Sequence, residues 1–140
     1  MLEVYRVNVN GEVKEFHEYW KASVWLKNNN VAADIEKYEK SECEYTKADI
    51  KCLLRRKFDV KTAKGYICKI AGGSIGPMTS FPEIAREHTN TRIRQIKEIA
   101  YGSKFTFKIE EQMESTYKAS EGYDPSYMTT YIYVSWGEAC

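Results

Sequence analysis

The chain has 140 residues, 43% of them hydrophobic and 29% charged, which is typical of one folded domain and excludes a disordered chain. Its 21 Lys and Arg residues against 20 Asp and Glu residues give a net charge of +1. This balance argues against a protein that coats nucleic acid or membrane with its whole surface. No apolar run approaches the roughly 20 residues of a membrane span, so we expect a soluble, cytoplasmic protein without a membrane partner.

The first segment of the chain predicts a β-hairpin followed by a helix. Residues 4–9 and 12–16 alternate between apolar and polar side chains and flank an Asn-Gly pair, the strongest short hairpin signal. A helix is expected over about 18–28, with Trp20 and Val24 among the residues at helical spacing. Residues 31–45 are polar and ambiguous, and a short helix near 32–35 is one option.

The middle of the chain predicts a helix, a strand and a break. Thr46 and Asp49 have the spacing of a capping box, and the apolar stripe of a helix follows them. Residues 65–70 are typical of a strand. The glycine-rich stretch 71–77 is expected to be a linker or a sharp turn.

A second helical pair is expected after this break. Ser80 and Glu83 form a capping box for a helix that ends near His88, and Thr91 can cap a further helix ending before Gly102. A strand over 105–109, a polar loop over 110–125 and a long strand over 127–136 complete the chain. The recurring order of elements indicates a diverged internal repeat.

These elements predict an α+β fold: a small sheet with two helix-turn-helix-like helical pairs and a C-terminal strand. Residues 1–72 form the first strand-helix-helix-strand module, and residues 73–110 form a second, degenerate helix-helix-strand module. Residues 111–140 are an acidic linker and a C-terminal strand that packs on the same core. We expect one domain with a shared sheet, because each module alone is small.

The sequence carries no enzyme signature. It has no P-loop, no dinucleotide-binding glycine motif, no nucleophile elbow and no zinc-protease motif. The four cysteines and two histidines fit no metal-ligand spacing, and free buried thiols are expected. We therefore predict a non-enzymatic protein with no cofactor, no metal and no small-molecule substrate.

The charge distribution points to a polyanionic partner. Residues 41–108 carry a net charge of +7 and residues 109–140 a net charge of −5. The two basic helical regions resemble helix-turn-helix elements, in which the second helix offers polar residues to DNA. The residues expected to contact DNA are Lys47, Lys51, Arg55, Arg56, Lys61, Lys64, Arg92, Arg94, Gln95 and Lys97.

Residues 5–70 resemble the nuclease-associated modular domain of type 1, which is found beside homing endonucleases. The matching motifs are Gly-Glu-Val-Lys-Glu-Phe at 11–16, Ala-Ser-Val-Trp-Leu at 22–26, Ile-Lys-Cys-Leu at 50–53 and Lys-Thr-Ala-Lys-Gly-Tyr-Ile at 61–67. The last of these is the most specific.

A second and more degenerate copy begins at residues 80–87 and continues to Gly102 and Phe105. The resemblance implies a helix-turn-helix module that reads double-stranded DNA and positions a nuclease. This chain departs from the family in the insert over about 28–45 and in having no nuclease domain. It is therefore expected to be a freestanding DNA reader encoded by a phage or another mobile element.

The alternative is a protein-binding module, such as a small phage-encoded inhibitor of a host enzyme or defence complex. The acidic tail and a face formed by Tyr127, Tyr131 and Tyr133 support it, because tyrosine is enriched in protein interfaces. The same tyrosines could instead be covered by a helix as ordinary core residues.

Overall fold

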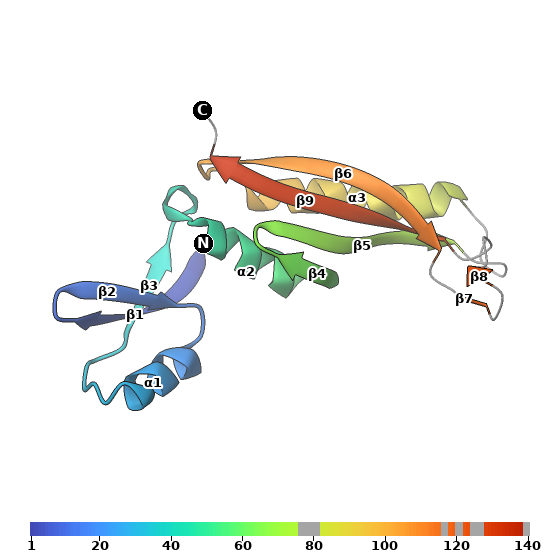
Figure 1. Cartoon of the computed structure of the whole chain (residues 1–140). Coiled ribbons are helices and arrows are strands. Elements are labelled where there is room, and N and C mark those ends of the chain that lie inside the picture. Colours follow the sequence, from blue (N-terminus) through green and yellow to red (C-terminus); the bar gives the residue numbers. More distant parts are fainter. Residues whose placement is uncertain (76–81, 116–117, 120–121, 124–127, 139–140) are drawn as a thin grey trace.

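The structure is a computed structural model that describes residues 1–75, 82–115, 118–119, 122–123 and 128–138. These residues form an α+β fold with three α-helices and two larger antiparallel sheets, as the sequence predicts for the fold class (Figure 1). The elements in chain order are β1 (Leu2–Val9), β2 (Glu12–Phe16), α1 (Tyr19–Asn28), β3 (Glu36–Lys40), the 3₁₀ turn η1 (Glu42–Glu44), α2 (Lys47–Lys57), β4 (Val60–Lys64), β5 (Ile67–Ile75), α3 (Pro82–Ile99), β6 (Phe105–Ser115), β7 (Lys118–Ala119), β8 (Gly122–Tyr123) and β9 (Met128–Glu138).

The N-terminal sheet has the strand order β2-β1-β3 and contains the predicted hairpin. Asn10 and Gly11 have φ angles of 53° and 85°, which a two-residue turn with positive φ at both positions requires. Helix α1 packs on this hairpin through the buried Ala22 and Leu26. The apolar face expected for α1 was wrong at two residues, because Trp20 is 59% exposed and Val24 is 46% exposed.

The short helix that was one option near residues 32–35 does not form, and residues 36–40 form strand β3. This strand pairs with β1, with Leu2 opposite Lys40 and Val4 opposite Tyr38. It occupies the chain between α1 and α2, so these two helices do not follow one another as the two helices of a helix-turn-helix do. The pairing with β3 satisfies the backbone N–H and C=O groups along this edge of β1, which favours a strand here.

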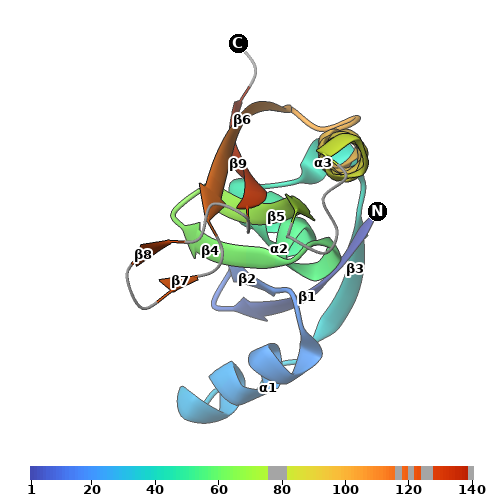
Figure 2. The same ribbon diagram turned by 90° about the vertical axis from the view of Figure 1, so that its right-hand side faces the viewer.

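The second sheet has the order β4-β5-β9-β6, so the C-terminal strand β9 lies in its interior. Helix α3 lies along one face of this sheet, and α2 lies between the two sheets (Figures 1 and 2). The main core joins Ile50 and Leu54 of α2 to Ile96 of α3 and Ile132 of β9, and Val4 of β1 is buried in the same cluster. The expected single sheet is therefore two sheets that share a core.

The predicted second helical pair was wrong, because residues 82–99 form one continuous helix. Thr89 is buried inside it, where its Oγ1 donates a hydrogen bond to the Ala85 carbonyl oxygen at 3.0 Å. The same Oγ1 accepts a hydrogen bond from the Gly73 N–H at 2.9 Å. These contacts dock the middle of α3 onto β5, which favours continuation of the helix over the cap expected at Thr91.

Two further boundaries differ from the sequence expectations. The glycine-rich stretch continues β5 as far as Ile75, and residues 76–77 lie outside the described residues. Strand β6 continues to Ser115 instead of ending at Ile109, because its whole length pairs with β9. None of the helices in the described residues combines the length and the apolar character needed to span a membrane.

Candidate nucleic-acid interface

A basic groove lies between the start of α1 and the exposed side of α2. It is an open hollow of about 480 Å³. We call this hollow the basic groove. It is lined by His17, Glu18, Lys21, Ala48, Lys51, Cys52, Arg55 and Arg56. Five of these side chains can carry a positive charge and only Glu18 can carry a negative one, so the groove has a strongly positive potential.

The cations of the groove come from two elements that are far apart in sequence. Lys51, Arg55 and Arg56 project from α2, whose capping box at Thr46 and buried apolar stripe turn its basic side outward. Lys21 comes from the first turn of α1. Within the part of the chain that the structure describes, no ion pair involves any of these four cations.

His17 adds a further positive charge to the groove. Its Nε2 lies 2.7 Å from Oδ1 of Asp49. The hydrogen bond with Asp49, with a smaller effect of the nearby Cys52, raises the pKa of His17 to about 9. The imidazole is therefore protonated at neutral pH. Arg56 donates a hydrogen bond to the His17 carbonyl oxygen at 2.9 Å, which joins α2 to the segment just before α1.

A buried cluster of charges beneath the groove fixes the position of His17. Asp49, almost completely buried, accepts hydrogen bonds from Lys40 Nζ at 2.6 Å and from the Thr46 N–H at 2.8 Å. Burial opposes its ionisation, but the hydrogen bonds from His17, Lys40 and Thr46 outweigh burial and hold the pKa of Asp49 below its ordinary value. Glu15 accepts a further hydrogen bond from Lys40 at 2.7 Å, so the cluster ties β2 and β3 to α2.

Three of the ten residues expected to contact DNA meet in this groove: Lys51, Arg55 and Arg56. Two others lie apart from it: Lys47 Nζ is 5.1 Å from the centre of the Tyr66 ring, and Lys61 is paired with Asp59. Lys64 is exposed at the end of β4.

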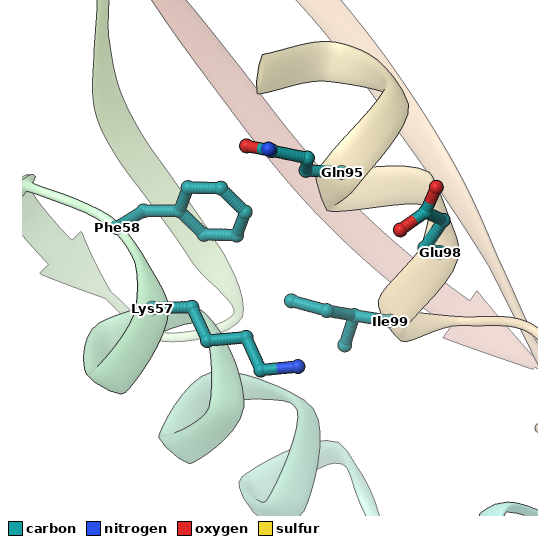
Figure 3. Close-up of a pocket in the computed structure, with 5 residues that line it drawn as sticks. All are labelled: Lys57, Phe58, Gln95, Glu98 and Ile99. Atoms are coloured by element: carbon teal, nitrogen blue, oxygen red, sulfur yellow. The ribbon is translucent and has the colours of Figure 1, made fainter. Parts of the chain in front are cut away.

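The four expected contacts on α3 do not line the basic groove. Arg94 and Lys97 are exposed, and Arg92 is half-buried. Gln95 lines a different hollow of about 530 Å³, where its side chain points toward Phe58, the residue that follows α2 (Figure 3). The continuous helix α3 thus presents these residues separately from the basic side of α2.

Sequence reasoning missed His17 and Lys21 as groove residues. No spacing rule connects residues 17–21 to residues 51–56, because they meet through tertiary contacts: the pairing of β3 with β1, the buried contact between Lys40 and Asp49, and the hydrogen bonds of His17. The one available signal was Lys21 next to the exposed Trp20, a cation beside an aromatic ring.

The tyrosines of β9 lie on the sheet face opposite the helices. Tyr131 and Tyr133 are half-buried, and Lys69 Nζ lies 4.2 Å from the centre of the Tyr131 ring. Glu114 joins them, since it pairs with Lys69 at 2.8 Å and accepts a hydrogen bond from the Tyr133 hydroxyl at 3.0 Å. Tyr127 lies outside the described residues.

The sequence led us to expect buried thiols, but the three described thiols do not all lie in the core. Cys43, Cys52 and Cys68 are free, but only Cys68 is buried, while Cys52 is half-buried and Cys43 is exposed. Cys140 lies outside the described residues.

Comparison of the chain with known protein families, curated proteins and solved structures found no match. The resemblance to the nuclease-associated modular domain therefore stays a prediction made from the sequence motifs.

Proposed function

We propose that this protein is a non-enzymatic DNA-binding protein that holds the phosphates of double-stranded DNA in the basic groove. The observation that carries the proposal is the convergence of Lys21, Lys51, Arg55 and Arg56 around one hollow with no carboxylate paired to them among the described residues. Phosphate contacts of Lys and Arg provide most of the sequence-independent affinity for DNA, because they release condensed counterions.

The composition of the groove suits a phosphate backbone. The guanidinium groups of Arg55 and Arg56 can each present two parallel donors to a phosphate, and the ammonium groups of Lys21 and Lys51 add point charges. The exposed Trp20 lies beside Lys21 and offers an apolar ring to the sugar or base of a bound strand.

Fluorescence anisotropy with a labelled duplex of random sequence tests this proposal. Replacing Lys51→Gln together with Arg55→Gln is expected to weaken binding about tenfold or more, since two charge-assisted phosphate contacts disappear. The matched control is Lys104→Gln together with Lys108→Gln, which removes the same charge from an exposed region around the start of β6.

The control variant is expected to keep its affinity within about twofold, because only the total charge of the protein changes. Equal losses in the two variants would show that net charge rather than the groove attracts DNA. Failure of the unmodified protein to bind at low salt would reject the proposal.

A second candidate function is protein binding by the sheet face that carries Tyr131 and Tyr133. It is favoured by the partial exposure of both tyrosines on a face that α3 does not cover, because α3 packs on the opposite face through Ile96. Replacing both tyrosines with Ser should remove a protein partner in a pull-down and leave DNA affinity unchanged. Loss of DNA affinity in this variant would instead place the face in the DNA interface.

A further inference from the structure

An exposed aromatic side chain lies at the rim of the basic groove. Trp20 of α1 is 59% exposed, although its ring is one of the largest apolar surfaces that a residue can carry. Its Nε1 donates a hydrogen bond to the carboxylate of Glu18, and Lys21 Nζ lies 5.6 Å from the centre of its ring. Because Glu18 and Lys21 both line the groove, these two contacts place the indole ring beside the groove cations.

Trp20 belongs to an apolar patch on the outer face of α1. Val24 follows one helical turn later on the same face and is also exposed. The buried residues Ala22 and Leu26 lie on the opposite face, where α1 packs on β1 and β2 (Figure 1). An exposed apolar patch beside a cluster of cations is typical of an interaction surface.

The groove and the ring together describe the chemistry of a partner. The cations Lys51, Arg55 and Arg56 suit phosphates, and an indole ring suits the flat face of a base. In a duplex the neighbouring base pairs cover both faces of each base, so stacking on Trp20 requires an unpaired base.

The groove offers one ring, which is too few for a protein that follows a long single strand. Surfaces of that kind present a series of aromatic rings to successive bases. The other exposed ring of α1, that of Tyr19, packs edge-on against Tyr5, with the ring centroids 5.8 Å apart. A duplex also carries a higher density of phosphate charge than a single strand, so the cations favour a duplex beside the unpaired base.

We propose that the basic groove recognises DNA at a junction of duplex and single strand. The phosphates of the duplex lie on the cations of the groove, and the first unpaired base stacks on Trp20. This inference rests on the proposed function and names the form of DNA that the groove selects.

Fluorescence anisotropy with four labelled DNAs tests this inference on the unmodified chain. They are a blunt duplex, the same duplex with a short single-stranded overhang, that overhang duplex with abasic nucleotides in place of the unpaired ones, and the single strand alone. We expect the overhang duplex to bind about tenfold more tightly than the blunt duplex, since one base gains a stacking contact. The abasic overhang keeps the phosphates and lacks the bases, so its affinity should lie within about twofold of that of the blunt duplex.

Substitutions of aromatic residues test whether the ring of Trp20 causes this preference. Trp20→Ala should reduce the ratio of the overhang affinity to the blunt affinity from about tenfold to about one, and Trp20→Phe should retain part of it. The matched control is Tyr101→Ala, which removes an exposed ring that does not line the groove and should keep the ratio of the unmodified chain. Circular dichroism checks the fold of each variant.

Equal affinity of the unmodified chain for the overhang and blunt duplexes overturns the inference and assigns the outer face of α1 to a partner other than a base. The inference is also overturned if the abasic overhang or the single strand alone binds as tightly as the overhang duplex, or if Trp20→Ala keeps the preference. The proposed function fails differently, by the absence of binding to the blunt duplex at low salt. Salt-dependent binding of the blunt duplex without a preference for the overhang therefore rejects this inference alone, and no binding of any of the four DNAs rejects both.

Discussion

The Nζ atom of Lys40 lies 2.6 Å from Oδ2 of Asp49, and both side chains are almost completely buried. This contact joins β3 to α2 and thereby the N-terminal sheet to the main core. Asp49 also holds His17 at the edge of the basic groove. The buried ion pair therefore has two roles: it connects two parts of the fold, and it positions one wall of the groove.

Replacing Lys40→Met tests the structural role of this pair. Removal of one partner leaves Asp49 buried with a reduced set of donors, and we expect the free energy of unfolding to fall by about 3 kcal/mol. Urea denaturation measures the change. The matched control is Lys37→Met on the same strand, where the pair with Glu3 is exposed and the expected loss is much smaller than at Lys40. A loss as small for Lys40 as for Lys37 would contradict the structural role.

The pKa of His17 predicts how stability depends on pH. Because hydrogen bonding with Asp49 raises this pKa from 6.5 to about 9, the folded state binds the proton more tightly than the unfolded state. The resulting stability is fully present below pH 6.5 and is lost as the pH rises through about 9; it amounts to about 3 kcal/mol.

Urea denaturation at several pH values, with His17→Gln as the reference, isolates this contribution. The difference in the free energy of unfolding between the unmodified chain and the variant should shrink steadily as the pH rises from 6.5 to about 9. A difference that is constant across these pH values would show that His17 is not protonated in the folded state.

Gly73 marks the closest approach of α3 to β5. A Cβ atom at this position would lie 2.0 Å from the carbonyl oxygen of Ala85, and backbone atoms cannot give way as a side chain can. We expect Gly73→Ala to lower the free energy of unfolding by roughly 3 kcal/mol. Gly137→Ala, where nothing lies within 4 Å of the added atom, is the control and should cost much less. If the two variants unfold at the same midpoint temperature, the close packing of α3 on β5 at Gly73 is contradicted.

Local signals in the sequence predict the elements whose structure depends on nearby residues. Asn10-Gly11 forms the expected hairpin turn, and the reciprocal hydrogen bonds of Thr46 and Asp49 form the expected capping box. Gly102 has the expected left-handed conformation after α3, with a φ of 80°. Each of these outcomes is determined within a few residues of the chain.

The sequence does not predict features that depend on distant contacts. Helix α3 is continuous because Thr89 is docked against Gly73, a contact 16 residues apart that no local pattern shows. The basic groove depends in the same way on Lys40 meeting Asp49, which brings Lys21 into the groove with Arg55. Half of the groove was predictable from the basic side of α2, and the other half required the path of the chain through β3.

The salt dependence of DNA affinity is the most direct test of the central claim. If Lys21, Lys51, Arg55 and Arg56 each neutralise one phosphate, the plot of log K against log salt concentration should have a slope of about −3 to −4. Loss of Lys51 and Arg55 should make the slope less steep by about 2, while the control variant at Lys104 and Lys108 should keep the original slope. A slope near zero for the unmodified chain, or equal slopes for all three proteins, would contradict binding of DNA in the basic groove.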